Sequence, residues 1–226
     1  QRDKGTIAVG GREMVLSKNM QKLVAGSSTI RKLFEEGIEL AKEVGAENVY
    51  DFSLGNPAAP VPEEVKKSIY DILENRNANF VHCYMPNAGY PEVREKVAAN
   101  LNKKYDSSFT KEDIIMTVGA AGGTNCVLRC LLEQGDEVLC FAPFFGEYNS
   151  YVMNFGGNLK VVPADYETFQ LNVEEADKYI TERTKAVIIN NPNNPSGVVY
   201  NKETLIRLQK MLEKAEERIG HPIYVL

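Results

Sequence analysis

The sequence predicts an α/β fold of three layers, in which an open and mostly parallel sheet has helices on both faces. Two observations predict it. From residue 113 to the end, short apolar runs alternate with segments of helical period. The runs are nearly continuous, as in Ala186-Val-Ile-Ile189, which is typical of strands that are buried on both faces. This part of the chain is therefore expected to form one sheet with crossover helices.

The first half of the chain is expected to be mainly helical. Segment 28–44 begins with residues that can cap a helix, and its apolar residues recur on one side. A short strand is expected at 49–54. In segment 62–75 the leading proline suits the first turn of a helix, where its missing N–H costs no hydrogen bond. Residues 89–105 complete this half as a third helix.

In the second half, apolar runs of strand length alternate with longer amphipathic segments. Strands are expected at 113–118, 137–141, 159–163, 185–190 and 222–226. Helices are expected at 120–133, 146–155, 173–180 and 202–219.

The two ends of the sequence carry separate expectations. Residues 1–13 have weak periodicity and Met14 would make a sensible initiator, so we interpret 1–13 as an expression remnant and exclude it from the fold. The final apolar run, Ile223–Leu226, should lie inside the sheet. Domains rarely stop within such a strand, so we expect a continuation beyond it.

Composition restricts the classes of partner. A hydrophobic content of 43% allows a buried core. The net charge of −5 and the pI near 5.3 give no electrostatic reason to expect nucleic acid or an anionic membrane. No apolar run approaches the length of a membrane span. We therefore expect a cytoplasmic protein with no nucleic-acid or membrane partner.

Four cysteines and two histidines are the candidate metal ligands. Cys126 and Cys130 are four residues apart in an apolar helical pattern and should share one helix face. A metal site would need further ligands at suitable spacing, and only His82 and His221 are available. All four cysteines, which include Cys83 and Cys140, are expected to be buried and reduced, and no metal is expected.

A turn of small residues, Thr117-Val-Gly-Ala-Ala-Gly-Gly-Thr124, joins an expected strand to an expected helix. Small side chains let an anion approach the backbone, and the start of a helix supplies oriented N–H groups. The turn therefore suits a phosphate. It does not match the dinucleotide fingerprint G-x-G-x-x-G. A merely tight strand–helix turn is an equally good interpretation at this point.

A second polar junction, Asn190-Asn-Pro-Asn-Asn-Pro-Ser-Gly197, follows the strand 185–190. Two prolines and a glycine restrict the loop, and its asparagines offer amide donors. Ligands bind at the carboxyl ends of strands in open α/β sheets. An asparagine-rich turn is also common in structural loops, but here it would hold a side-chain amide near a ligand.

Four segments together resemble the pyridoxal-phosphate-dependent aminotransferases of class I/II, the aspartate aminotransferase family of fold type I. The asparagine loop resembles the family's N-x-x-N-P-[ST]-G signature. The other three segments, in family order, are Phe52–Pro57 (FSLGNP), Tyr84–Ala98 (YMPNAGYPEVREKVA) and Thr117–Tyr148, which contains the phosphate turn and the aromatic APFF loop. The resemblance implies the cofactor-binding large domain of that fold, incomplete at its C-terminus, over 55–226. It implies an N-terminal arm and part of the small domain over 14–54.

The resemblance also implies the site residues. The backbone amides of Ala120 and Ala121 would bind the cofactor phosphate. Phe145 would stack on the pyridine ring, where the family often has tryptophan or tyrosine. Asn194 would hydrogen-bond the cofactor's phenolic oxygen and contact the substrate carboxylate. Two further residues lie outside these loops: Gly55 would line the substrate side, and Tyr84 would reach the phosphate of a neighbouring subunit in a homodimer.

The catalytic lysine of the family has no counterpart in this sequence. Transamination needs a lysine that forms a Schiff base with pyridoxal phosphate, and a carboxylate that faces the pyridinium nitrogen. In the family both follow the asparagine loop, beyond the point where this chain stops. The resemblance implies an amino-acid and a 2-oxo-acid substrate for the parent protein and no turnover by this chain alone. A carbon–sulfur lyase of the same fold, or a non-catalytic scaffold derived from it, is the alternative.

Overall fold

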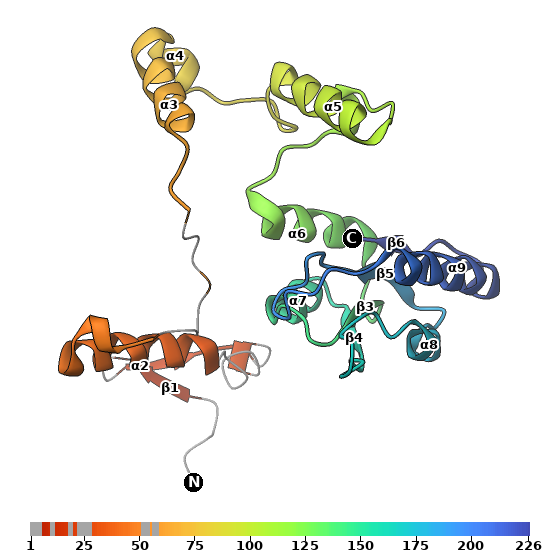
Figure 1. Ribbon diagram of the computed structural model, residues 1–226. Helices are drawn as coiled ribbons and strands as arrows, with labels where there is room; N and C mark the ends of the chain where they lie inside the picture. The colour runs from red at the N-terminus through yellow and green to blue at the C-terminus, as the bar shows by residue number, and fades with distance from the viewer. Residues whose placement is uncertain (1–5, 10–11, 18–19, 22–28, 51–54, 56–58) are drawn as a thin grey trace. The chain divides into compact units, whose positions relative to one another are not determined.

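The computed structural model describes residues 6–9, 12–17, 20–21, 29–50, 55 and 59–226. Its contacts divide the chain into two compact units, Gln1–Tyr84 and Met85–Leu226, which we describe separately (Figure 1). The domain boundary expected between residues 54 and 55 stays a prediction.

The first unit contains a hairpin and helices. Strands β1 (Thr6–Val9) and β2 (Arg12–Val15) pair in an antiparallel register that aligns Thr6 with Val15. This hairpin was not predicted, because residues 1–13 were excluded from the expected fold. The helices are α2 (Thr29–Val44), the 3₁₀ turn η1 (Ala46–Asn48), α3 (Glu63–Asn75) and α4 (Ala78–Val81). Of the strand expected at 49–54, residues 49 and 50 are not in a strand and 51–54 lie outside the described residues.

The residues at the starts of α3 and α4 explain where these two helices begin. Pro62 directly precedes α3 as its N-cap residue, so its missing N–H costs no helical hydrogen bond. The short helix α4 was not predicted. The side chain of Asn77 caps it by accepting a hydrogen bond from the Asn79 N–H at 2.8 Å.

The second unit contains the sheet. Its helices are α5 (Pro91–Tyr105), η2 (Lys111–Asp113), α6 (Gly119–Leu131), α7 (Glu147–Met153), α8 (Val173–Ala176), η3 (Asp177–Tyr179) and α9 (Lys202–Ile219). Its strands are β3 (Glu137–Phe141), β4 (Asn158–Val162), β5 (Thr184–Ile188) and β6 (Tyr224–Val225). The helix expected at 173–180 is divided into α8 and the tighter turn η3.

The four strands form one parallel sheet in the order β4-β3-β5-β6. Successive side chains of a strand point to opposite faces, and both faces are buried here. In β3, Val138 and Cys140 join one apolar cluster, while Leu139 and Phe141 join the other. This arrangement confirms the predicted α/β fold with helices on both faces of a parallel sheet.

Different helices cover the two faces of the sheet. Leu128 of α6 and Val152 of α7 pack on the face that Val138 shares. Leu208 and Leu212 of α9 pack with α8 on the opposite face. Each face is thereby sealed by crossover helices, as expected for parallel strands.

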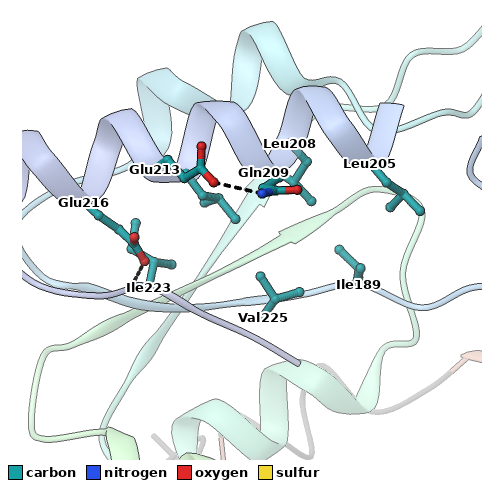
Figure 2. Close-up of a pocket in the computed structure, with 9 residues that line it drawn as sticks. Ile189, Leu205, Leu208, Gln209, Glu213, Glu216, Ile223 and Val225 are labelled. Atoms are coloured by element: carbon teal, nitrogen blue, oxygen red, sulfur yellow. Dashed lines mark hydrogen bonds between the residues drawn. The ribbon is translucent and has the colours of Figure 1, made fainter. Parts of the chain in front are cut away.

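An apolar groove of about 320 Å³ runs between α9 and the β5–β6 edge (Figure 2). Leu205 of α9 faces Ile189 and Val225 across it in the figure. At one end the Glu216 carboxylate accepts a hydrogen bond from the Ile223 N–H at 2.7 Å. This bond connects the end of α9 to the entry of β6.

The prediction of a strand at 113–118 is wrong. An apolar run becomes a strand only where a neighbour completes its ladder, and within the described residues no strand pairs with this segment. It is held at isolated points instead. The Met116 N–H donates to the Ala88 carbonyl at 3.0 Å, and the buried Arg94 of α5 donates to the carbonyl groups of Lys111 (2.8 Å) and Ile114 (3.3 Å).

The burial expected for the cysteines holds only for Cys140; the thiols of Cys83, Cys126 and Cys130 are exposed. Helix α6 packs on the sheet through Leu128, and no described element covers the face that carries Cys126 and Cys130. Helical spacing correctly placed these two on a common face but could not identify which face is covered.

The exposure of the cysteines predicts their reactivity. Burial raises the pKa of the Cys140 thiol from an ordinary value of 9.0 to about 12, and the thiolate is the reactive form. We expect dithiobis(nitrobenzoate) at pH 8 to modify three thiols of the folded chain quickly and Cys140 only after denaturation. Rapid reaction of all four would contradict this, and Cys140→Ala, which should lose only the slow phase, is the control.

The raised pKa of Cys140 also makes the stability of the fold depend on pH. The folded chain holds the Cys140 proton more strongly than the unfolded chain does. This contribution to folding is complete below the ordinary thiol pKa and is lost as the pH rises toward about 12.

Candidate active site

Two loops leave neighbouring strands at the same edge of the sheet. Strands β3 and β5 are parallel and adjacent, with Cys140 aligned to Ile188. The loop after β3 carries Phe145, and the loop after β5 carries Asn194. The topology therefore brings the loop of Phe145 and the loop of Asn194 to the same edge of the sheet, the usual site of ligands in this kind of sheet.

The loop after β3 and the helix α7 that follows it carry a group of aromatic residues. The Tyr148 ring meets Phe145 edge to face, with centroids 5.7 Å apart and an interplanar angle of 81°. It lies nearly parallel to Phe144, with centroids 6.5 Å apart, and contacts Tyr151 at 6.3 Å. Phe145 keeps part of its surface accessible, because the residue is 38% exposed. This ring can pack against a planar ligand.

The loop after β5 is stiffened by its own asparagines. Asn193 is buried and donates from Nδ2 to the Tyr200 hydroxyl at 2.9 Å. Its Oδ1 accepts from the Ser196 N–H at 3.1 Å and from the Ser196 hydroxyl at 2.7 Å. Burial, the larger cause, raises the pKa of Tyr200 even though the Asn193 hydrogen bond lowers it. Tyr200 is therefore a neutral partner in this network near neutral pH.

Asn190 and Asn194 occupy different positions in the same loop. The Asn190 Oδ1 accepts a hydrogen bond from the Asn194 N–H at 2.9 Å, and its Nδ2 donates to the Tyr148 hydroxyl at 3.3 Å. The Asn194 side chain is exposed and has no hydrogen bond with any described residue. Its amide is available to a ligand while its backbone is held.

Helix α6 presents the small-residue turn. Since α6 packs on the sheet and ends shortly before β3 begins, it runs opposite to β3, and its first turn lies toward the carboxyl edge. Ala120 and Ala121 lie in this turn, where backbone N–H groups have no helical acceptor, and no side chain caps the helix. A Cβ built on Gly119, whose φ is +67°, would meet nothing within 4 Å. An anion can approach these amides.

Gly55 and Tyr84 belong to the first unit. A Cβ built on Gly55 would meet no described atom within 4 Å, and the Tyr84 ring is fully exposed. The two units are described separately, so the roles of these two residues stay predictions. Within the described residues, no group of three His, Cys, Asp or Glu side chains could hold a metal ion. No described helix is both long and apolar enough to cross a membrane.

Three residues that support these loops were not predicted from the sequence: Tyr148, Asn193 and Tyr200. Asn193 and Tyr200 are seven residues apart, and a tyrosine shortly after an asparagine-rich turn is the only signal of their contact. Tyr148 is forty-two residues from Asn190, so no local pattern could indicate that pair.

The chain is similar to known proteins over most of its length. Residues 46–224 match the family described as aminotransferase class I and II. A probable aspartate/prephenate aminotransferase of Aquifex aeolicus is 35% identical over 79% of this chain and 44% of its own length. For an aspartate aminotransferase of Pyrococcus abyssi, the identity is 37% over the same shares, 79% and 44%. The chain spans about half the length of the curated relatives it matches.

Solved structures of aminotransferases are also similar to this chain. An aminotransferase from Eubacterium rectale superposes with a TM-score of 0.89 at 40% identity, over 94% of this chain and 54% of that one. The aspartate aminotransferase of Thermus thermophilus with maleate superposes with a TM-score of 0.77 at 29% identity, over 94% and 53%. The length of the family match and the likeness of the fold agree: this chain belongs to the class I and II aminotransferases.

Proposed function

We propose that the protein to which this chain belongs transfers an amino group between an amino acid and a 2-oxo acid with pyridoxal phosphate as its cofactor. One observation carries the proposal. In a chain of the aminotransferase family, an uncapped helix start, an accessible aromatic ring and an unpaired amide side chain lie toward one edge of a parallel sheet. These features match a phosphate, a pyridine ring and a phenolic oxygen.

The residues present fit the cofactor. The amides of Ala120 and Ala121 would hold the phosphate, because the start of a helix favours an anion, no side chain caps this helix, and the space beside Gly119 is open. Phe145 would pack on the pyridine ring, with Tyr148 supporting it from the side. Asn194 would donate to the phenolic oxygen and contact the substrate carboxylate, since its side chain is unpaired in the described structure.

Pyridoxal phosphate supplies a reactive aldehyde carbon and an electron-withdrawing ring, which together let an amino group move between carbon skeletons. The residues of this chain would bind and orient that ring. None of them is proposed as the lysine that moves the proton, and transamination is proposed for the whole protein only.

The remaining proposals rest on the family resemblance and on composition. Gly55 would leave room for the substrate, and Tyr84 would reach the phosphate of the neighbouring subunit in a homodimer. The cofactor-binding domain would begin at residue 55, after an arm and small-domain part at 14–54. A cytoplasmic location and a biosynthetic role are proposed as well. The amino-group donor and the acceptor both stay general, because related proteins are named for aspartate, prephenate and aromatic amino acids.

The variant Ala120→Asp tests the phosphate site. An acidic residue in the first turn of α6 is favourable for the helix, so folding should be unaffected. The same charge would repel a phosphate, since like charges about 4 Å apart repel by about 4 kcal/mol near a protein surface. We expect the dissociation constant of pyridoxal phosphate, measured in the full protein as its gene encodes it, to rise by about tenfold or more.

Ala120→Asn is the matched control, because it has the same shape without the charge. It should bind pyridoxal phosphate far better than Ala120→Asp, and the difference should shrink in high salt. Equal affinities of the two variants would place the phosphate elsewhere. Failure of the unaltered protein to bind the cofactor would reject the proposed function.

A further inference from the structure

We propose that Asn190 and Tyr148 are positioning residues, whose side-chain hydrogen bond joins the loop that carries Asn194 to the loop that carries Phe145. The inference rests on the proposed function, in which Asn194 and Phe145 contact the cofactor. It adds a reason why those two contacts keep a fixed separation.

The Asn190 side chain uses both ends of its amide. Its Oδ1 accepts from the Asn194 N–H at 2.9 Å, and its Nδ2 donates to the Tyr148 hydroxyl at 3.3 Å. The amide is planar, so these bonds share one orientation, and rotating it by half a turn would place a donor against the Asn194 N–H. One side chain therefore controls the backbone of Asn194 and the position of Tyr148 together.

Tyr148 transmits the constraint to Phe145. The Tyr148 N–H donates to the Phe145 carbonyl at 3.1 Å, and the two rings meet edge to face at 5.7 Å. Edge-to-face pairs of aromatic rings are favourable beyond the burial of their area. The path from Asn194 to Phe145 therefore consists of short contacts through Asn190 and Tyr148, and every member is in the described structure.

The Asn190–Tyr148 hydrogen bond lies where the pairing of the strands no longer holds the two segments together. Strands β3 and β5 set their own spacing through the sheet, but Phe145 and Asn194 lie beyond the last paired residues, Cys140 and Ile188. Past that point the Asn190–Tyr148 bond is a direct link between the two loops. Both partners are part-buried, which limits competition from water.

The chain offers a matched control at the opposite end of the same two strands. The Thr181 hydroxyl, shortly before β5, donates to the Glu137 carboxylate at the start of β3 at 2.6 Å. Tyr148→Phe and Thr181→Val each remove one hydroxyl that connects the β3 and β5 segments. Only Tyr148→Phe cuts the connection at the end that carries Phe145 and Asn194.

The experiment is a double-mutant cycle in the full protein, with Tyr148→Phe, Asn190→Ala and the combination. Its readouts are the dissociation constant of pyridoxal phosphate, the visible circular dichroism of the bound cofactor, and the melting temperature without cofactor. We expect Tyr148→Phe to weaken cofactor binding by about 3- to 10-fold, the range for one hydrogen bond. Asn190→Ala should weaken it at least as much, because it also removes the bond to the Asn194 N–H. The combination should be clearly less damaging than the product of the two single effects, because both remove the same link.

Thr181→Val separates positioning from general stability. It should lower the melting temperature at least as much as Tyr148→Phe but leave the dichroism of the bound cofactor unchanged. Single variants that bind like the unaltered protein, effects that simply multiply, or equal dichroism changes in Tyr148→Phe and Thr181→Val would each overturn the inference. If the unaltered protein does not bind the cofactor, the proposed function itself fails, and that result is obtained before any variant is made.

Discussion

Asn194→Ala is expected to lower kcat/KM for transamination in the full protein by about 10- to 100-fold, the effect of one lost charge-assisted hydrogen bond. The Asn194 amide is exposed and unpaired, so its removal leaves no buried partner and should not disturb folding. The pKa at which the bound cofactor changes its absorbance should rise, because the phenolic oxygen loses a donor and holds the nearby proton more strongly. A pH titration of the absorbance, with steady-state kinetics, measures both effects.

The control for this prediction is Asn149→Ala. Asn149 is an exposed asparagine of α7 whose side chain has, among the described residues, one hydrogen bond, to the Met153 sulfur at 3.8 Å. Its variant should retain the kinetics and the titration curve of the unaltered protein. Coincident titration curves for Asn194→Ala and the unaltered protein would remove Asn194 from the cofactor site.

Leu139→Ala is expected to reduce the free energy of unfolding by about 3 kcal/mol or more, as for other fully buried leucines. Leu139 lies in the centre of the sheet with 0% of its surface exposed, packed in the cluster that includes Val187 and Leu212. Helices and strands surround the site, so the cavity can close only partly. Urea denaturation of the 226-residue chain, followed by far-ultraviolet circular dichroism, measures the loss.

Val199→Ala is the control for the core. Val199 is 63% exposed, so this change should alter the unfolding free energy by only about 0.5 kcal/mol. Similar losses in the two variants would mean that the cluster around Leu139 is not the main source of stability.

The sheet was predictable because its strands are buried on both faces. Residues 137–141 and 202–219 were expected as a strand and a helix, and they form β3 and α9 with those bounds. Continuous apolar runs and long amphipathic periods are local signals, so they can be recognised without knowledge of their partners. The order of the strands is not a local property and required the structure.

The errors have the same physical origin. The segment 113–118 has the composition of a strand, but a strand also requires a partner. Cys126 and Cys130 share a helix face as expected, yet burial depends on which element covers that face. The site residues came from the family resemblance and stay predictions. What the structure adds is the adjacency of β3 and β5, and with it the Asn190–Tyr148 contact.

The order of the strands also has a consequence for folding kinetics. The chain forms β3, crosses to β4 on one side, and only then returns to add β5 on the other side of β3. The two candidate ligand loops are consequently far apart in any intermediate that lacks the β3–β5 pairing. Closing so long a stretch of chain is slow compared with forming a helix or hairpin. Recognition of a ligand at this edge is therefore a late event, and during synthesis it must await the emergence of β5 and the loop that follows it.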